Sequence, residues 1–231
     1  MNRTQKILRN FLICLLLCLG IHAAMGFPPY TVAGMCRQVA RDHLMEELEP
    51  IYVEKEKHKY SGDMFQRTYT YVIARGGEHY VAFLYDRNLL RNERHHAYDG
   101  EIGKELLCTA RNGVLYVAGD FGDALSARST VTATNGSEVR QYRLVGERLA
   151  EDLFAFVYSE EDYWWRVDDI PVEEMNLAQI ARYWYRTPHG DNGYSYDHAE
   201  LPVCVTLYDA AGTPSQLPEM SIGTYDLHLW W

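Results

Sequence analysis

The sequence predicts an α+β protein, a mainly antiparallel sheet of several hairpins with an N-terminal helix and one late helix. Three turns between strand-like runs carry this prediction: Gly76-Gly77, Asn112-Gly113 and Asn135-Gly136. Glycine and asparagine tolerate the positive φ angles that tight hairpin turns need. Helical features appear in two segments, residues 31–49 and 172–185.

The first predicted helix runs from Thr31 to Glu49. Pro50 is expected to end it, because the residue before a proline avoids the α region. The residues that follow, Glu54 to Lys59, alternate in charge and are interpreted as a solvated connector. The helix is predicted from four residues that would share one face: Val32, Cys36, Val39 and His43.

The strand predictions rest on runs rich in β-branched and aromatic residues. Three hairpins are expected, from residues 68–73 with 79–85, 106–110 with 114–117, and 130–133 with 139–144. Further strands are expected over residues 153–158, 163–167, 203–208 and 224–231. The late helix is predicted over Val172–Tyr185, with Pro171 near its first turn and Asp169 as its cap.

The N-terminus has the features of a secretory signal peptide. Arg3, Lys6 and Arg9 precede an apolar run from Phe11 to Ile21, and Ala24-Met25-Gly26 offers a small-x-small cleavage site. We therefore expect a signal peptide over residues 1–26 and one α+β domain over residues 27–231, located in a periplasm or outside the cell. An uncleaved membrane anchor is the alternative.

Charge limits the partners of the exported domain. The chain has a formal net charge of -10, and removal of the three cationic residues of the signal peptide would leave -13. Nucleic acid and anionic membrane surfaces are disfavoured, because phosphate binding depends largely on Lys and Arg. A basic protein is the partner that such a charge would attract.

One arrangement of residues suggests a cysteine nucleophile. Cys36 lies early in the first predicted helix, where a helix dipole favours the thiolate, and His79 opens a following strand. This order of helix cysteine and strand histidine resembles that of cell-wall amidases and peptidases of the NlpC/P60 and CHAP type. The resemblance covers about 50 residues and implies a papain-like cysteine hydrolase that uses Cys36 and His79. Packing of Cys36 on the apolar helix face is the structural alternative.

The other two cysteines of the exported domain are predicted to form a disulfide. Cys108 and Cys204 lie in apolar strand-like runs, and disulfides are the rule in exported proteins. Because both would lie in one sheet-built core, we expect them to pair and to leave Cys36 as a buried thiol.

Metal and cofactor sites are not expected. Neighbouring His95 and His96 would point to opposite faces of a strand, and the loop 189–198 lacks the glutamate of a calcium-binding loop. Glu173-Glu174 is interpreted as solvated charge. Tyr and Trp are enriched at binding surfaces, so the aromatic clusters are the expected binding residues: Trp164, Trp165, Tyr183, Trp184 and Tyr185.

The sequence therefore favours an exported, soluble protein of the binding or inhibitor type, which recognises a protein partner through an acidic and aromatic surface and carries no chemistry of its own. The first alternative is the Cys36/His79 hydrolase. The second is an outer-membrane barrel, because the alternation of Tyr225, Leu227, Leu229 and Trp231 resembles the last strand of such barrels.

Overall fold

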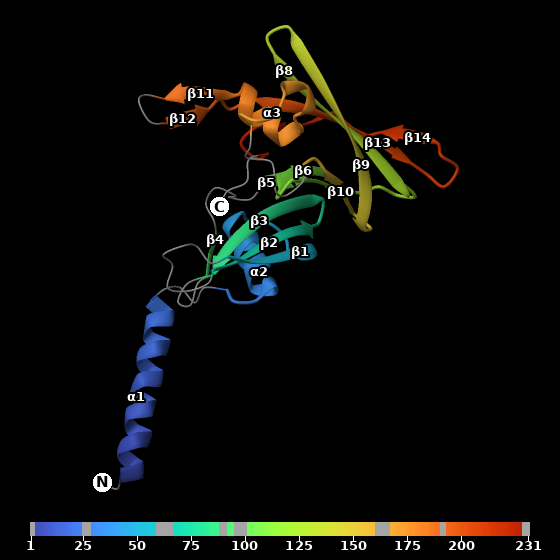
Figure 1. The fold of residues 1–231 in the computed structure, drawn as a ribbon. Coiled ribbons are helices and arrows are strands. Elements are labelled where there is room, and N and C mark those ends of the chain that lie inside the picture. The colour runs from blue at the N-terminus through green and yellow to red at the C-terminus, as the bar shows by residue number, and fades with distance from the viewer. Residues whose placement is uncertain are drawn as a thin grey trace.

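A computed structural model describes residues 3–24, 29–58, 67–87, 92–94, 101–159, 167–189 and 193–227. It confirms the α+β class: the strands form antiparallel sheets, one helix is N-terminal and one comes late (Figure 1). The helices are α1 (Arg3–Ala24), α2 (Val32–Asp42) and α3 (Leu177–Trp184), with a short 3₁₀ turn, η2 (Val172–Glu174), before α3.

Two main sheets lie face to face. The first sheet has the order β1-β2-β3-β4, with β5 also paired to β3, and the second has the order β14-β13-β8-β9-β10-β7-β6, with β15 also paired to β13. The first is built from β1 (Glu49–His58), β2 (Arg67–Gly76), β3 (His79–Arg87), β4 (Asn92–Arg94) and β5 (Glu101–Lys104). The strands of the second are β6 (Leu106–Arg111), β7 (Val114–Gly119), β8 (Ser126–Asn135), β9 (Glu138–Ala150), β10 (Leu153–Val157), β13 (Glu200–Tyr208), β14 (Pro214–Gln216) and β15 (Met220–Gly223).

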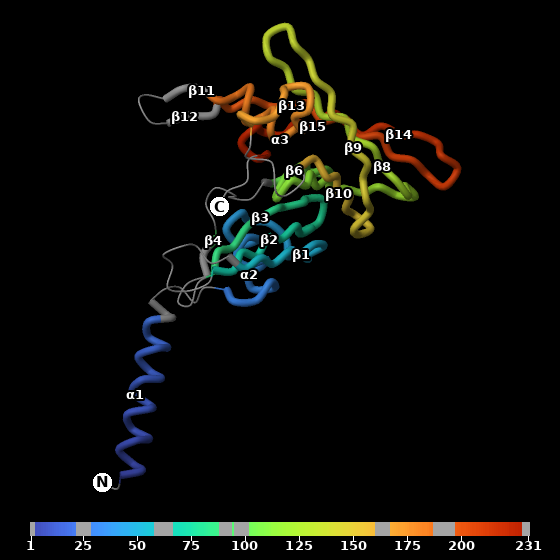
Figure 2. Tube along the Cα trace, viewed as in Figure 1, coloured from blue at the N-terminus to red at the C-terminus, as the bar shows by residue number. Residues whose placement is uncertain are grey.

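A separate hairpin is formed by β11 (Arg186–His189) and β12 (Gly193–Tyr196). The trace in Figure 2 shows β8 and β9 as a long hairpin that extends beyond the rest of the second sheet. All three predicted hairpin turns are present. Asn112 and Gly113 have φ angles of 50° and 76°, which is the backbone that an Asn-Gly turn favours.

The layers are held together by three apolar clusters. Strand β3 shows how: Val81 and Phe83 pack toward α2, while the alternating residues Tyr80 and Leu84 pack toward the second sheet. The third cluster joins the other face of the second sheet to α3. Strands β2 and β3 of the first sheet are therefore covered on both faces, which explains their almost continuous burial.

The first predicted helix is shorter than expected. Thr31 caps α2 by accepting a hydrogen bond from the Gly34 backbone amide, but the helix ends at Asp42 and not near Pro50. Leu44, with a φ of 54°, turns the chain out of the helical path. Proline is tolerated at the start of the strand that follows, so Pro50 belongs to β1.

The charged segment after this helix is not a solvated connector. Glu54 and Glu56 lie on one face of β1 and are half-buried, whereas Lys55 and Lys57 lie on the other face and are exposed. Alternation along a strand separates the two signs of charge. The prediction was wrong because a run of mixed charge can also be a strand in which acidic and basic residues alternate between the two faces.

The late helix also begins later than predicted. Asn176 forms a capping box with Gln179, which starts α3 at Leu177, and the residues around Pro171 form η2 instead. At the C-terminus the chain turns over residues 224–227, after β15. Residues 163–166 and 228–231, which belong to two further predicted strands, lie outside the described residues.

The predicted disulfide is absent: Cys108 and Cys204 form no bond to each other. Cys108 on β6 packs against the core between the second sheet and α3. On β13, Val203 and Val205 point into that core, so Cys204 between them points to the opposite face. The prediction failed because flanking apolar residues show that a strand is buried, but not which face a given residue occupies.

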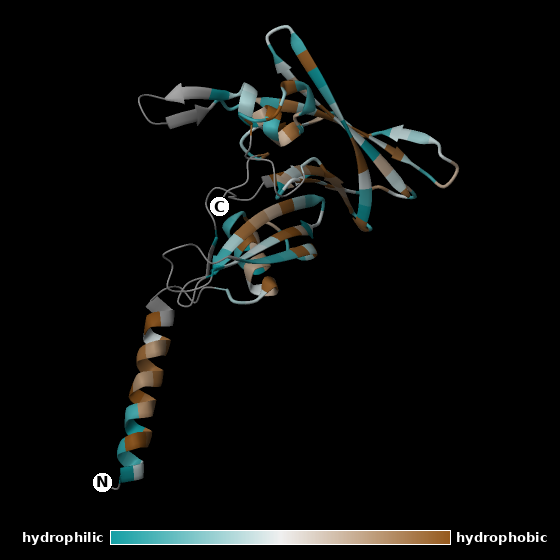
Figure 3. Ribbon diagram, in the orientation of Figure 1, coloured by the Kyte–Doolittle hydropathy of each residue, from teal (hydrophilic) through white to brown (hydrophobic). Residues whose placement is uncertain are grey.

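The N-terminal helix α1 projects away from the sheets and is rich in apolar residues (Figure 3). Within the described part of the structure, none of the residues Arg3–Ile21 is buried, and their large apolar side chains are exposed. By length and composition, residues Arg3–Ile21 could cross a membrane, a test that signal sequences also pass. The helix is compatible with the predicted signal peptide.

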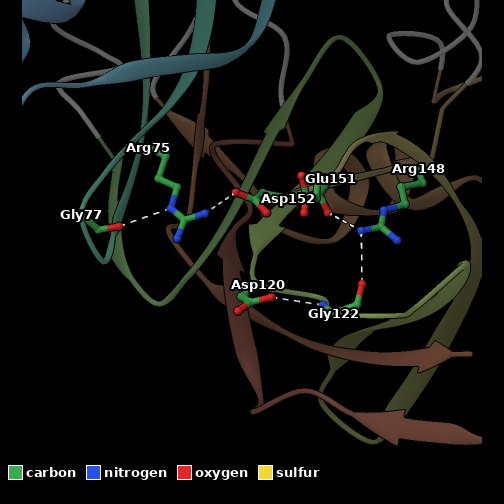
Figure 4. A network of polar contacts seen from close by, with 7 residues as sticks. All are labelled: Arg75, Gly77, Asp120, Gly122, Arg148, Glu151 and Asp152. Atoms are coloured by element: carbon green, nitrogen blue, oxygen red, sulfur yellow. Dashed lines mark hydrogen bonds and ion pairs between the residues drawn. The ribbon is translucent and has the colours of Figure 1, made fainter.

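The interface between the two sheets has different polar contacts at its two ends. At one end, Arg75 on β2 binds Asp152 in the turn before β10 at 2.7 Å, beside the backbone contacts of Arg148 (Figure 4). At the other end, Arg111 on β6 binds Glu56 on β1 at 2.9 Å. We call the residues at this second end the seam cluster: Tyr52, Glu54, Glu56, Tyr71, Thr109, Arg111, Asn112 and Tyr116.

Candidate acidic and aromatic binding face

The surface beside α3 combines exposed carboxylates with an exposed tyrosine. Asp168 and Asp169 precede η2, Glu173 and Glu174 lie in it, and all four side chains are exposed. Tyr183, near the end of α3, is 38% exposed. We call these five residues the acidic–aromatic face.

The position of α3 follows from its sequence. Its apolar residues recur at helical spacing and are buried in the core of the second sheet: Leu177, Ala178, Ile180 and Ala181. Tyr183 falls outside this stripe and therefore faces away from the core. The helix is long enough to bring its C-terminal aromatic residues next to the β8–β9 hairpin.

Arg140 on β9 joins three elements at this face. Its guanidinium donates to Glu138 at 3.1 Å and to the backbone carbonyl of Val172, and it lies 5.6 Å from the ring of Trp184. The contact with Val172 holds η2, and with it Glu173 and Glu174, beside the end of α3. Such a cation over a ring adds attraction from the ring's quadrupole.

Arg186 makes the second connection. It binds the Asp168 carboxylate at 3.3 Å and lies 5.8 Å from the ring of Tyr183. The Asp168 side chain remains 77% exposed, so this ion pair is open to solvent. Two arginines thus bring the acidic segment and the aromatic residues of α3 together.

Two tyrosines fix the hairpin that carries Arg140. The Tyr185 hydroxyl donates to the Thr134 carbonyl at 2.8 Å and accepts from the Thr134 amide at 3.3 Å. The Tyr142 hydroxyl donates to the carbonyl of Met175 at 3.2 Å. Burial raises the pKa of Tyr142, and its contact with Arg140 partly opposes this. Tyr142 therefore acts as a neutral hydrogen-bonding group at ordinary pH.

The structure divides the predicted aromatic residues by role. Tyr183 is available at the surface, Trp184 is half-buried against the core, and Tyr185 holds β8. Trp164 and Trp165 lie outside the described residues. Sequence reasoning missed both Arg140 and Arg186. The run of aromatic residues directly before Arg186 could have indicated Arg186, but no comparable feature indicated Arg140.

The alternative site at Cys36 has the environment of a structural thiol. Cys36 is 1% exposed among apolar residues, and burial raises its pKa to about 11. It lies close enough to Tyr85 to influence that residue's pKa. His79 is at the opposite end of β3 from Tyr85, and six residues of a strand span about 20 Å.

His79 instead lines an open cavity of about 550 Å³ between the β2–β3 turn and the segment after α2. His43 and Glu46 line the same cavity, but Cys36 does not. A cysteine nucleophile needs a thiolate and a base within hydrogen-bonding reach. Burial favours the neutral thiol of Cys36, and the described residues do not place His79 beside it.

Within the described part of the chain, no three His, Cys, Asp or Glu side chains gather closely enough to hold a metal ion. His95 and His96, which were considered as ligands, lie outside that part. No protein-family model matches the chain, and neither a curated protein nor a solved structure is significantly similar to it.

Proposed function

We propose that the protein is exported and acts by binding a basic protein partner through the acidic–aromatic face. The observation that carries this proposal is the pair of arginine contacts that bring exposed carboxylates beside Tyr183. Binding hot spots are enriched in Tyr, Trp and Arg, and complementary charge raises the rate of encounter.

The face has parts suited to both steps of such a recognition. Four exposed carboxylates attract a cationic partner, whose Lys or Arg side chains can replace Arg186 on Asp168. Tyr183 offers a rigid ring of large area for the contact that follows. Because Arg140 and Tyr185 hold η2, α3 and the hairpin in place, little ordering is needed on binding.

The test is a pull-down from the native envelope fraction, with the captured protein then purified and its affinity measured for each variant. We expect Tyr183→Ala to weaken binding by about tenfold or more, the scale of a hot spot. Tyr30→Ala is the matched control, since Tyr30 is also exposed and lies 5.4 Å from an arginine, Arg87.

Charge is tested separately. Glu173→Gln with Glu174→Gln is expected to slow association at low salt and to have little effect at high salt, because exposed charges are screened. Glu46→Gln with Glu47→Gln, another exposed adjacent pair, is the control. Equal effects of the two pairs, or of Tyr183→Ala and Tyr30→Ala, would reject this face as the binding surface.

A further inference from the structure

The seam cluster places two carboxylates next to each other between the sheets. Glu54 and Glu56, two residues apart on β1, point to the same side and lie within hydrogen-bonding reach of each other. A single guanidinium faces them from the second sheet within the described residues, that of Arg111 on β6, and it binds Glu56. One cation therefore faces two acids.

The surroundings leave Glu54 poorly compensated. Arg111 is 5% exposed and also lies 5.4 Å from the ring of Tyr71, while the amide of Asn112 donates to Glu56. Oε2 of Glu54 and Nε of Arg111 are both buried, with no hydrogen-bond partner among the described residues. An ionised carboxylate in this position costs more than a protonated one.

Among the described residues, the other groups that act on Glu54 are phenols and carry no positive charge. Tyr52 on β1 and Tyr116 on β7 face it, with their hydroxyl oxygens 3.3 Å apart. Burial raises the pKa of both tyrosines, so they remain neutral well above pH 7. Within the described part of the chain, the polar neighbours of Glu54 are thus Glu56, Arg111, Asn112 and two neutral phenols.

We propose that the Glu54–Glu56 pair is a proton-dependent fastening between the two sheets, which holds most firmly when Glu54 carries a proton. In that state Glu54 can donate to Glu56, and Arg111 balances the one charge that remains. Loss of the proton puts two negative charges beside one guanidinium and weakens the contact of β1 with the second sheet.

The direction of the titration agrees with this geometry. Burial raises the pKa of Glu54 above its usual 4.5, and the neighbouring charge of Glu56 raises it further, while Arg111 and Asn112 oppose the shift. A raised pKa means that the folded state prefers the protonated form. Its contribution to stability is complete below pH 4.5 and is lost as the pH rises through the folded value.

The test compares urea unfolding midpoints of the wild type and Glu54→Gln at pH 4 and at pH 7.5. Glutamine imitates the protonated acid, so the variant should unfold at a higher urea concentration than the wild type at pH 7.5 and at a similar one at pH 4. Glu49→Gln removes an exposed carboxylate from the same strand and should leave both midpoints unchanged. A Glu54→Gln shift of the same size at both pH values, or no shift, would overturn the proposal.

A direct titration keeps the proposal testable if Glu54→Gln does not fold. Carboxyl carbon NMR of the wild type should show Glu54 titrating above the usual range for glutamate. The Glu56→Gln variant should lower that midpoint, because it removes the neighbouring charge. A Glu54 midpoint at or below 4.5 would contradict the proposal.

Discussion

Arg111 and Arg186 have the same kinds of partner in two different settings. Each binds one carboxylate and lies near one tyrosine ring, at 2.9 Å and 5.4 Å for Arg111 and at 3.3 Å and 5.8 Å for Arg186. The Arg111 side chain is only 7% exposed, whereas that of Arg186 is 24% exposed and its acid is almost free in solvent.

Burial decides what each group can do. At the surface, water can replace either partner, so the Arg186 contacts are weak and can be exchanged for those of a bound protein. In the seam, Arg111 is buried and Glu56 is only 26% exposed, so solvent compensates a missing partner poorly and the Arg111 contacts stabilise the packing of the two sheets. The same three chemical groups therefore suit recognition in one place and cohesion in the other.

The largest effect is expected from removal of the buried arginine. Arg111→Met keeps much of the side-chain volume but leaves the Glu56 carboxylate without its cation, which should cost about 3–5 kcal/mol of unfolding free energy. Arg186→Met, the matched surface change, should cost no more than about 1 kcal/mol. Chemical unfolding measures both, and equal losses would show that burial does not separate the two groups.

A smaller loss is expected from a neutral hydrogen bond in the same seam. Tyr71→Phe leaves the buried Thr109 hydroxyl, now 3.1 Å from the Tyr71 oxygen, without that contact, at a cost of about 1–3 kcal/mol. Thr109→Val in the Tyr71→Phe background should recover part of the loss. If the two substitutions add without interaction, this hydrogen bond does not stabilise the seam.

The features that could be predicted from the sequence are local ones. The Gly77, Asn112-Gly113 and Gly136 turns each specify a hairpin, because few residues adopt a positive φ. The adjacent aromatic residues Tyr183 and Trp184, of which Tyr183 belongs to the proposed binding face, could also be found. Contacts that cross the fold could not: nothing in the sequence pairs Arg111 with Glu56, which are 55 residues apart.

The orientation of single residues was the second limit. The same apolar neighbours surround Cys204 and a core residue of β13, and only the register with β8 shows that Cys204 points outward. The alternation of Glu and Lys in the β1 segment was visible in the sequence. Only the structure shows that the second sheet packs against the Glu face of β1 and leaves the Lys face exposed. Both failures concern which face of a strand is covered, and that is fixed by tertiary packing.

Because the Cys36 thiol is buried between α2 and the first sheet, we expect the protein to lose stability at alkaline pH. The pKa of Cys36 is raised from 9.0 to about 11, so the folded state favours the neutral thiol. Its contribution to stability is present below pH 9 and is lost as the pH rises toward 11. The unfolding midpoint of the wild type should therefore fall more steeply over that range than that of Cys36→Ala.

Thiol labelling provides an independent check of the same residue. At pH 8 a thiol reagent should modify the half-exposed Cys204 before Cys36, which should react only on unfolding. Rapid alkylation of Cys36 in the folded protein would revive the hydrolase hypothesis.

The smallest effect on stability is expected at the Arg75–Asp152 end of the interface between the sheets. Arg75 is 45% exposed, so Asp152→Asn should lower the unfolding free energy by only about 0.2–1 kcal/mol, and less at high salt. Unfolding at low and high ionic strength measures this difference. A loss as large as that of Arg111→Met would mean that the two ends of the strands do not differ.

The most direct test of the difference between the acidic–aromatic face and the seam cluster is oxidative footprinting of tyrosines. It is done on the free protein and on the purified complex with the captured partner. The proposed binding function predicts that Tyr183 is oxidised in the free protein and protected in the complex, while the buried Tyr71 reacts little in either state. If Tyr183 is oxidised equally in both states while the partner is bound, the acidic–aromatic face is not the surface that recognises it.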